Sequence, residues 1–439
     1  MKLKVALLSF LLIFSGAQLL AQEEIALDQV IALALEKNYD VQLARNTSLA
    51  ASTDYNYSIG ALLPQLNANG STVWNNNHQE FEFEDETRNR SGDAKSNNMT
   101  GSLQLVWTLF DGTKMFATRE RLSELATQGD LNVKNQMVNS IAAVINNYYS
   151  VVRQKQQLLA IQELMSINEE RVKLAERKLQ VGTGGKPELL QAKVDLNATK
   201  TLHIQQETLI IQLKDQLNGL VALQLPSVFD VADTILINLD IKLEDISENI
   251  ESKNFSLQSS KYDLTIARTS LHERRAERSP VINLNAAYNY SRTNNTQLIN
   301  PFSSLVTQIN GLNYGLSLTL PIFNGFNVTR NVQQAKITVN RQQLLFDQLK
   351  QQTDINIRNA YVNYDNAKKV LLLEEENILL AKENVTIALE SFKRGVATFI
   401  ELRTAQQSLA DGYNRLINAR YLAKVAETEL LRLSGGLLK

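Results

Sequence analysis

The side chains that most often carry enzyme chemistry are few and scattered in this sequence. Its three histidines, His78, His203 and His272, lie far apart, and none belongs to a cluster with metal-ligand spacing. No cysteine occurs, which excludes disulfides, thiolate metal sites and an acylated N-terminal cysteine. No G-x-S-x-G element is present either. We therefore expect no catalytic residue, no metal site and no cofactor, and we interpret His203, at a heptad position, as a packing residue.

One glycine-rich segment superficially resembles a phosphate-binding loop. Residues 182–186 read Gly-Thr-Gly-Gly-Lys. The segment lacks the G-x-x-x-x-G-K-[ST] spacing, is followed by Pro187, and lies between helical patterns rather than after a strand. We therefore reject nucleotide binding. The 45 basic and 46 acidic residues also leave no basic footprint for nucleic acid.

The N-terminus has the three parts of a secretory signal peptide. Lys2 and Lys4 precede an apolar run from Val5 to Phe14, and a short stretch of small and polar residues ends near Ala21-Gln22. The apolar run is too short to cross a membrane as a helix. We predict that residues 1–22 direct export and that the mature chain acts outside the cytoplasm. No later stretch approaches the ~18 apolar residues of a membrane helix, so a membrane-spanning form must use strands.

The sequence contains the same order of landmarks twice. The landmarks recur at a shift of 216 residues early in each half and of 213 residues later on: Asn38 with Asn254, Pro64 with Pro280, Gly112 with Gly325, Gly182 with Gly395, and Glu188 with Glu401. Such self-similarity is typical of a duplicated structural unit. We predict a first repeat at 23–218, a second repeat at 243–439, and a connector at 219–242.

Two segments of nearly 70 residues have the composition of unbroken helices. Residues 113–181 contain no proline and one glycine, and residues 327–394 contain neither. Each would be roughly 100 Å long at 1.5 Å per residue. Apolar residues spaced by three and four positions, such as Leu371, Ile378 and Val385, predict coiled-coil packing. A new heptad series follows each glycine break, so each half should form a helical hairpin.

Four shorter segments alternate apolar and polar residues, as strands do. They cover 66–74, 103–109, 282–291 and 312–320, and the last has leucine and tyrosine on one face. A segment of about 10 residues can cross a bilayer when it is tilted. Export, aromatic residues in the strands and a polar face of Asn, Ser and Thr favour a membrane barrel over a half-buried sheet in a soluble sandwich.

Four strands are too few to close a membrane barrel, which needs about eight. An open edge would leave backbone groups unpaired in lipid. We therefore expect closure by other copies of the chain, and the residues alone leave a dimer of eight strands and a trimer of twelve open. The acidic, polar segment from His78 to Asn98 is predicted to be an extracellular loop.

These landmarks resemble the TolC family of outer-membrane efflux and secretion channels. The resemblance covers nearly the whole mature chain and rests on the duplicated order of Leu27 to Asn38, Leu63-Pro64, Phe110-Asp111-Gly112, and Phe392 to Gly395 before Leu402. It implies a mixed α and β membrane protein, in which a trimeric twelve-stranded β-barrel with four strands per chain continues into a periplasmic α-barrel of helical hairpins. The implied function is passive: the protein would be the outer-membrane exit duct of a tripartite efflux or type I secretion system for small molecules or polypeptides.

The resemblance also implies partners and a docking site. The hairpin turns would be periplasmic tips that dock a membrane-fusion adaptor of an inner-membrane pump. The matching tip residues are Val181, Gly182, Thr183, Arg394 and Gly395. Other expected partners are two further copies of the chain and outer-membrane lipid.

Two acids at matching positions after the turns, Glu188 and Glu401, are candidates for a pore constriction. In family members acidic rings face the lumen, and three copies of each glutamate would favour cations there. The alternative is that both are ordinary helix-start acids, stabilised by the helix dipole. Ala397 stands where better-known members have arginine, and Thr404 where a second acid is usual, so the closing contacts of those relatives do not transfer directly.

A different function remains open on sequence grounds. The chain could be a soluble periplasmic coiled-coil scaffold whose strands form a small sandwich. Such a protein would fractionate with the soluble periplasm without detergent.

Overall fold

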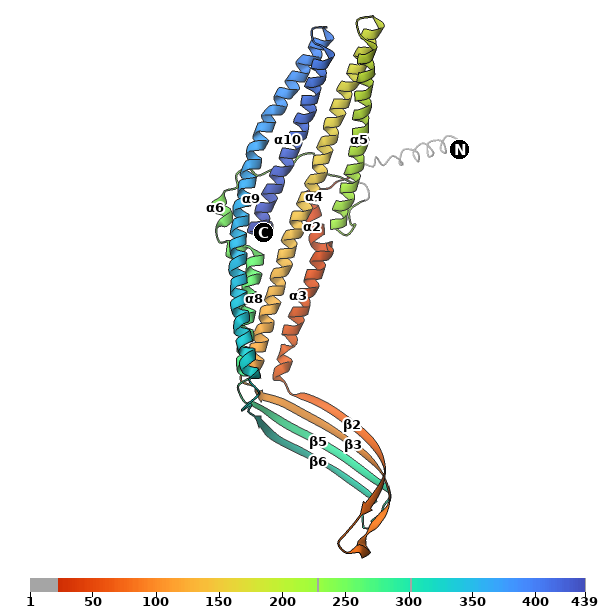
Figure 1. The fold of residues 1–439 in the computed structure, drawn as a ribbon, viewed down its shortest axis with the longest axis vertical. Coiled ribbons are helices and arrows are strands. Elements are labelled where there is room, and N and C mark those ends of the chain that lie inside the picture. The colour runs from red at the N-terminus through yellow and green to blue at the C-terminus, as the bar shows by residue number, and fades with distance from the viewer. Residues whose placement is uncertain (1–22, 227–228, 301, 439) are drawn as a thin grey trace, which may run out of the picture. The chain divides into compact units, whose positions relative to one another are not determined.

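The computed structural model describes residues 23–226, 229–300 and 302–438 (Figure 1). The predicted signal peptide, residues 1–22, lies outside the described residues. The first half contains β1 (Glu23–Glu24), α2 (Leu27–Lys37), α3 (Tyr39–Tyr57), β2 (Gln65–Phe81), β3 (Arg90–Phe110), α4 (Lys114–Gln180) and α5 (Lys186–Leu220). After β4 (Phe229–Asp230) the second half contains α6 (Leu243–Ser247), α7 (Ile250–Lys253), α8 (Phe255–Ala276), β5 (Val281–Gln297), β6 (Val306–Thr319), α9 (Asn327–Lys393) and α10 (Phe399–Ser434).

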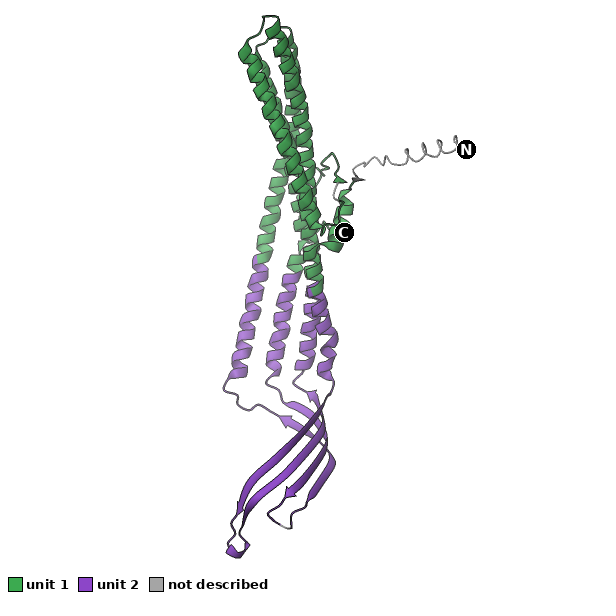
Figure 2. Ribbon diagram, turned by 90° about the vertical axis from the view of Figure 1, so that its right-hand side faces the viewer, with its two compact units in different colours: residues 1–46, 131–258, 349–439 green, residues 47–130, 259–348 purple. Residues whose placement is uncertain are grey.

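Residue contacts divide the chain into two compact units (Figure 2). Unit 1 comprises residues 1–46, 131–258 and 349–439, and unit 2 comprises residues 47–130 and 259–348. Each unit draws on both halves of the sequence, because α4 and α9 contribute residues to both. The compact units therefore do not coincide with the predicted repeats. The repeats at 23–218 and 243–439 and the connector at 219–242 stay predictions about how the sequence was duplicated.

The two long helices confirm the sequence prediction almost to the residue. Both α4 and α9 contain 67 residues, roughly 100 Å at 1.5 Å per residue. The predicted heptad residues of the second hairpin form one buried cluster in unit 1, in which Leu371, Ile378 and Val385 of α9 pack against Leu409 and Leu416 of α10. Across the described residues, no helix combines the length and the apolar character that crossing a membrane requires.

The predicted connector is pinned to the long helices of unit 1 by side-chain hydrogen bonds. Lys155 of α4 donates to the carboxylates of Asp230 (2.5 Å) and Asp233 (2.7 Å). Burial opposes the charged form of Lys155, but these two hydrogen bonds outweigh it and raise its pKa. On the other hairpin, Lys368 of α9 donates to the backbone oxygen of Leu239. The segment between β4 and α6 thus contacts both hairpins.

Unit 2 contains a four-stranded antiparallel sheet in the order β2-β3-β5-β6. The register aligns apolar residues of all four strands, so that Leu66, Leu105, Ala286 and Tyr314 form one row across the sheet. The neighbouring row, Asn67, Gln104, Ala287 and Asn313, lies on the opposite face and is mostly polar. The predicted division into one apolar and one polar face is therefore confirmed. The two outer strands, β2 and β6, each leave one edge without a partner strand in this sheet.

The predicted extracellular loop from His78 to Asn98 is wrong in its extent. β2 continues to Phe81 and β3 begins at Arg90, so only residues 82–89 connect the two strands. Polar cross-strand pairs hold this part of the ladder, including His78 with Asp93 (2.8 Å) and Asn75 with Ser96 (3.2 Å). Since both faces are solvent-exposed or polar here, no hydrophobic alternation marks the strands.

Two asparagines at the predicted repeat landmark tie helices together in equivalent ways. The Nδ2 of Asn38 donates to the backbone oxygen of Leu220 (2.9 Å), and that of Asn254 donates to the oxygen of Leu433 (2.8 Å). The Oδ1 of Asn254 also accepts from the N–H of Leu257 (2.9 Å), which caps the start of α8. Each asparagine thus joins a helix start to the end of the returning helix of its own half.

We predict that Asn254→Ala lowers the free energy of unfolding by about 2–4 kcal/mol, because it removes a helix cap and leaves a buried carbonyl unpaired. Asn197→Ala, on an exposed position of α5, should change it by less than about 0.5 kcal/mol. Denaturant titration of the purified protein in detergent, followed by circular dichroism, measures both. Equal effects of the two substitutions would contradict this role of Asn254.

Candidate functional site

The first hairpin turn is closed by backbone hydrogen bonds that require a glycine. Thr183 N–H donates to the oxygen of Lys178 (2.9 Å), and Gly182 N–H donates to that of Leu179 (3.2 Å). This pair of bonds is the Schellman arrangement, in which the residue after the helix adopts a left-handed backbone. Gly182 has φ +80°, which explains the glycine at this landmark.

The second turn repeats this geometry. Val396 N–H donates to the oxygen of Ser391 (2.9 Å), Gly395 N–H donates to that of Phe392 (3.1 Å), and Gly395 has φ +74°. The predicted docking residues therefore occupy the two turns as expected from their spacing. The side chains of Val181 and Val396 are 72% and 80% exposed, so both tips present an apolar side chain to solvent.

The two predicted constriction acids lie at matching helix starts but in different surroundings. Glu401 closes a capping box: its Oε2 accepts from Thr398 N–H (2.7 Å), and the Oγ1 of Thr398 accepts from Glu401 N–H (3.2 Å). Glu188 is half-buried, and its carboxylate has no hydrogen-bond partner among the described residues. The helix-start interpretation therefore describes Glu401 well, while the role of Glu188 in a constriction stays a prediction.

A buried arginine below the tips joins the two hairpins of unit 1. Arg171 of α4 is 1% exposed. Its Nη2 donates to Asp195 on α5 (2.6 Å), and its Nη1 donates to the Oε1 of Gln406 on α10 (2.6 Å). The guanidinium carbon lies 5.1 Å from the ring centre of Phe399. Burial lowers the pKa of Arg171 and Asp195 raises it, but an arginine remains charged throughout the physiological range.

The second hairpin also contributes an arginine to this network. Arg403 of α10 lies 3.4 Å from the same carboxylate of Asp195, so one acid serves two guanidinium groups. Within the described residues, Arg171 Nε and Gln406 Nε2 are buried without an acceptor. Two cations, one anion and two unpaired donors make this a partly satisfied network, which costs more than a fully paired one.

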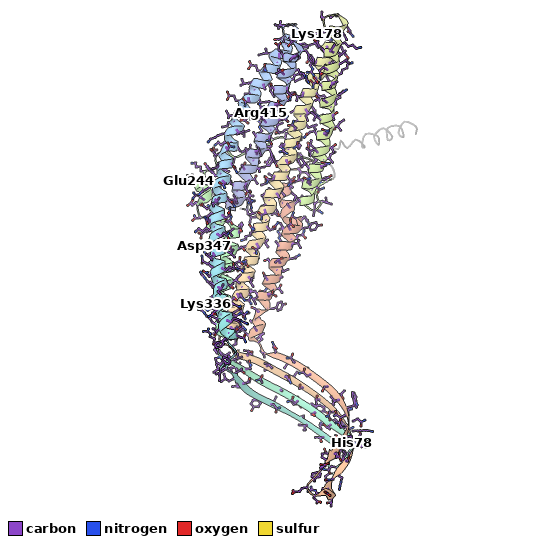
Figure 3. The ribbon with its side chains drawn as sticks, viewed as in Figure 1. His78, Lys178, Glu244, Lys336, Asp347 and Arg415 are labelled. Carbon is purple, nitrogen blue, oxygen red and sulfur yellow. The ribbon has the colours of Figure 1, made fainter. Side chains whose placement is uncertain are left out.

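Further contacts between the hairpins lie closer to the tips. The Nζ of Lys178 on α4 donates to the backbone oxygen of Phe392 (3.1 Å) and lies 3.7 Å from the centre of its ring. Lys393 of α9 pairs with Glu170 of α4 (3.1 Å). Figure 3 shows Lys178 at the end of the hairpins where the turns lie. Contacts from charged side chains therefore connect the hairpins from Arg171 up to the turns.

Sequence reasoning missed Arg171, Asp195, Arg403 and Gln406. The available signal was indirect: Arg171 precedes Val172 in the heptad series, a position that flanks a coiled-coil seam. Arg171 and Gln406 are separated by 235 residues, so spacing alone could not indicate that they meet.

In the described part of the chain, the contacts of His78 and His203 do not form a catalytic or metal site. His203 packs in the α4–α5 seam, where its Nε2 lies 3.2 Å from Gln162, and the packing interpretation agrees with this contact. On the strands, His78 lies between Asp93 (Nδ1 to Oδ1, 2.8 Å) and Ser91 (Nε2 to Oγ, 3.2 Å), the order of a hydrolase triad. The side chains of His78 and Asp93 are 66% and 57% exposed, whereas a working triad is held in a site that excludes water and provides oxyanion donors. Over the described residues, no three His, Cys, Asp or Glu side chains converge in a metal-binding group.

Comparison with known proteins places this geometry in a family. The sequence model of the family described as Outer membrane efflux protein matches residues 30–223 and 246–436. The outer membrane protein TolC of Vibrio cholerae is 22% identical over 397 residues, covering 88% of this chain and 85% of TolC. The alkaline protease secretion protein AprF of Pseudomonas aeruginosa is 21% identical over 399 residues, covering 89% and 80%. The crystal structure of the Campylobacter jejuni CmeC outer membrane channel superposes with a TM-score of 0.77 at 19% identity, covering 93% of this chain and 85% of CmeC.

We predict that Arg171→Ala lowers the free energy of unfolding by about 3–5 kcal/mol, because it takes the buried cation away from the carboxylate of Asp195 and leaves the Oε1 of Gln406 without a donor. Arg177→Ala, at an exposed position six residues further along α4, should change it by less than about 0.5 kcal/mol. The same denaturant titration measures both variants. A loss for Arg171→Ala no larger than that of the control would show that Arg171 does not brace the hairpins.

Proposed function

This chain belongs to the outer membrane efflux protein family and forms the outer-membrane exit duct of a tripartite efflux or secretion system, and we propose that it does so as a homotrimer. The family assignment rests on a match that covers both halves of the sequence. In this role the protein is a passive conduit, and an inner-membrane pump supplies the energy.

The sheet of unit 2 supports closure of the barrel by further copies of the chain. Its apolar face is exposed in the single chain: Leu312 is 63% exposed, Tyr314 80% and Leu316 70%. The edges of β2 and β6 carry backbone groups that lipid cannot satisfy. Pairing β6 of one copy with β2 of the next satisfies both edges, and three copies give a barrel of twelve strands with the apolar face toward lipid and the polar face toward the lumen.

The helices of unit 1 also support assembly. A groove of about 630 Å³ lies between α9 and α10. Eight small or apolar residues, such as Ala360, Ala367 and Leu422, line it together with four asparagines and Glu429. On α9, Leu372, Leu379 and Ile387 are each more than half exposed. A soluble scaffold would leave this surface in water, whereas neighbouring copies in an α-barrel cover it.

The tips are the proposed docking surface for a periplasmic membrane-fusion adaptor. Val181 and Val396 present exposed apolar side chains, and Ile400 at the start of α10 is 73% exposed. Arg394 is exposed beside them. A rigid turn with exposed apolar groups and a cation suits a contact with another protein, because the glycine-dependent backbone holds these groups in place. Gly182, Thr183 and Gly395 contribute the shape of the two turns.

The nature of the cargo follows only broadly from the relatives. AprF is named for the secretion of a protease, so a duct of this family can serve a polypeptide exporter. A passive tunnel conducts its cargo without reacting with it. We therefore propose export without covalent change, with selection of the cargo left to the inner-membrane pump.

Glu188 and Glu401 are proposed to form the cation-selective constriction of the trimer. Six carboxylates near the narrow end of a tube raise the local concentration of cations. Glu401 also caps α10, and glutamine can take over its position in a capping box. The double substitution to glutamine therefore removes the charge while it preserves the helix start.

We predict that the purified protein forms pores in planar lipid bilayers and that Glu188→Gln with Glu401→Gln lowers the cation-to-anion permeability ratio several-fold at low salt. The matched control, Glu244→Gln with Asp245→Asn, removes two charges from exposed positions of α6 and should leave the ratio unchanged. Reversal potentials in a salt gradient measure the ratio. Unchanged selectivity would remove the acidic constriction but not the duct, whereas a protein that forms no pores would contradict the duct itself.

A further inference from the structure

The turn between β6 and α9 exposes a group of large apolar side chains. Ile322 is 92% exposed, Phe323 76% and Phe326 71%. The two phenylalanine rings pack edge to face with centroids 5.6 Å apart, and Phe326 adopts a left-handed backbone (φ +62°). A bulky residue is strained in this conformation, so the turn holds its aromatic side chains outward at some cost. In water such a group is unfavourable, which indicates that something covers it.

A tryptophan and a further phenylalanine lie at the corresponding level of the other strand and helix ends of unit 2. Trp107, near the end of β3, donates its Nε1–H to the backbone oxygen of Leu62 (2.9 Å), just before β2 begins. Phe116, in the first turn of α4, is 58% exposed. Aromatic side chains with one polar bond and one apolar side are enriched where a membrane meets water.

Three exposed arginines without an acidic partner lie at the same strand–helix boundary. Arg275 lies at the end of α8, Arg278 follows it, and Arg330 lies in the first turn of α9. In the part of the chain that the structure describes, none of the three forms an ion pair. The nearby acids at the end of α8 and just after it are already engaged: Glu273 binds Arg121 (2.9 Å), and Glu277 binds Arg274 (2.8 Å) and Lys114 (3.7 Å). The surplus charge at this boundary is therefore positive.

These segments are neighbours within unit 2. A Cβ on Gly112, in the turn before α4, would lie 2.4 Å from the Cβ of Ser279, so this turn packs directly on the chain that follows α8. A groove lined by Ser270 and Arg274 of α8 and by Asn331 of α9 joins the other two helices. Figure 2 shows the helix ends of unit 2 meeting the strands at this level.

The position of this boundary relative to the apolar strands indicates what covers it. Leu316 and Leu318 of β6, 70% and 68% exposed, directly precede the turn, so the lipid-facing band of the proposed barrel ends here. This step rests on the proposed function, in which the strands cross the outer membrane. The plane where an apolar band ends and helices begin is the headgroup layer on the periplasmic side.

We propose that Arg275, Arg278 and Arg330, together with the Ile322–Phe326 turn, form a collar that binds the phosphate of anionic phospholipids in that headgroup layer. The planar guanidinium group matches a phosphate with two parallel hydrogen bonds, and unpaired arginines are free to form them. The phenylalanine rings lie among the acyl chains next to the headgroups. The alternative is that a second copy of the chain covers the turn. The three unpaired arginines favour anionic lipid instead, because an apolar contact between copies would not require cations beside it.

The first test compares lipid binding by the full-length protein and two matched triple variants. The protein is purified into nanodiscs made from equal parts of phosphatidylglycerol and phosphatidylcholine, and the lipids that remain bound on gentle extraction are counted by native mass spectrometry. We expect enrichment of phosphatidylglycerol in the wild type and a drop of about a hundredfold in Arg275→Gln/Arg278→Gln/Arg330→Gln, since each of the three basic residues near an anionic surface contributes about fivefold. Arg177→Gln/Arg341→Gln/Arg358→Gln, with the same loss of charge on exposed positions of α4 and α9, should behave as wild type. No enrichment in the wild type, or equal loss in both variants, would overturn the proposal.

The second test does not depend on the folding of a triple variant. Because the chain contains no cysteine, Phe323→Cys introduces a single attachment point for a polarity-sensitive fluorophore. In phosphatidylglycerol-containing vesicles we expect this label to be quenched by lipids spin-labelled at the headgroup, whereas a label at Val181→Cys on the tip should not be. A Phe323 label that is shielded equally with and without lipid would instead assign the turn to a contact between copies and would reject the collar.

Conductance separates this proposal from the duct on which it rests. The collar variant should form pores with wild-type conductance, because none of its three positions is assigned to the lumen. Wild-type pores without phosphatidylglycerol enrichment would reject the collar alone, and an absence of pores in the wild type would reject the duct.

Discussion

The rest of the structure depends on the unpaired edges of one four-stranded sheet. β2 and β6 each have one edge with no partner strand in the sheet, and lipid offers no hydrogen bonds to the exposed backbone. The apolar face, with residues such as Tyr314 largely exposed, is equally unsuited to water. A chain of this kind is complete only when sister copies supply the missing strands. The proposed lipid-facing surface, lumen and acidic constriction all belong to that assembly, and a single chain would have none of them.

The helical hairpins meet a different demand, because they must pack as long rods and still fit together at the tips. The heptad seam between α9 and α10 provides the apolar packing. The buried Arg171 adds a polar link between the hairpins. An apolar residue of similar volume would fill the same space without the free-energy cost of removing a charged group from water. Polar groups kept in such places often fix one register among several. We interpret Arg171 in this way, because its hydrogen bond to Gln406 and the contact of Arg403 with Asp195 form only when the two hairpins are aligned.

Much of the fold could be predicted from the sequence because its strongest patterns are long. The absence of proline bounded the helices at 113–181 and 327–394, and the structure gives Lys114–Gln180 and Asn327–Lys393. The strands were predicted too short, since the alternation disappears where polar residues such as His78 and Asp93 pair on exposed strands. The glycine turns followed from spacing, but the Arg171 network did not, because it depends on which faces of two distant hairpins meet. The helix-start alternative for Glu401 followed from the sequence, and the structure adds a capping box with Thr398 that gives Glu401 a structural role beside the proposed one.

The number of chains in the purified particle tests the central claim most directly. The mature protein, extracted from membranes in mild detergent, can be measured by native mass spectrometry under conditions that preserve subunit contacts. The account predicts a particle of three chains that requires detergent to remain in solution. A detergent-independent monomer would contradict it, because four strands with two open edges cannot then be the wall of a membrane channel.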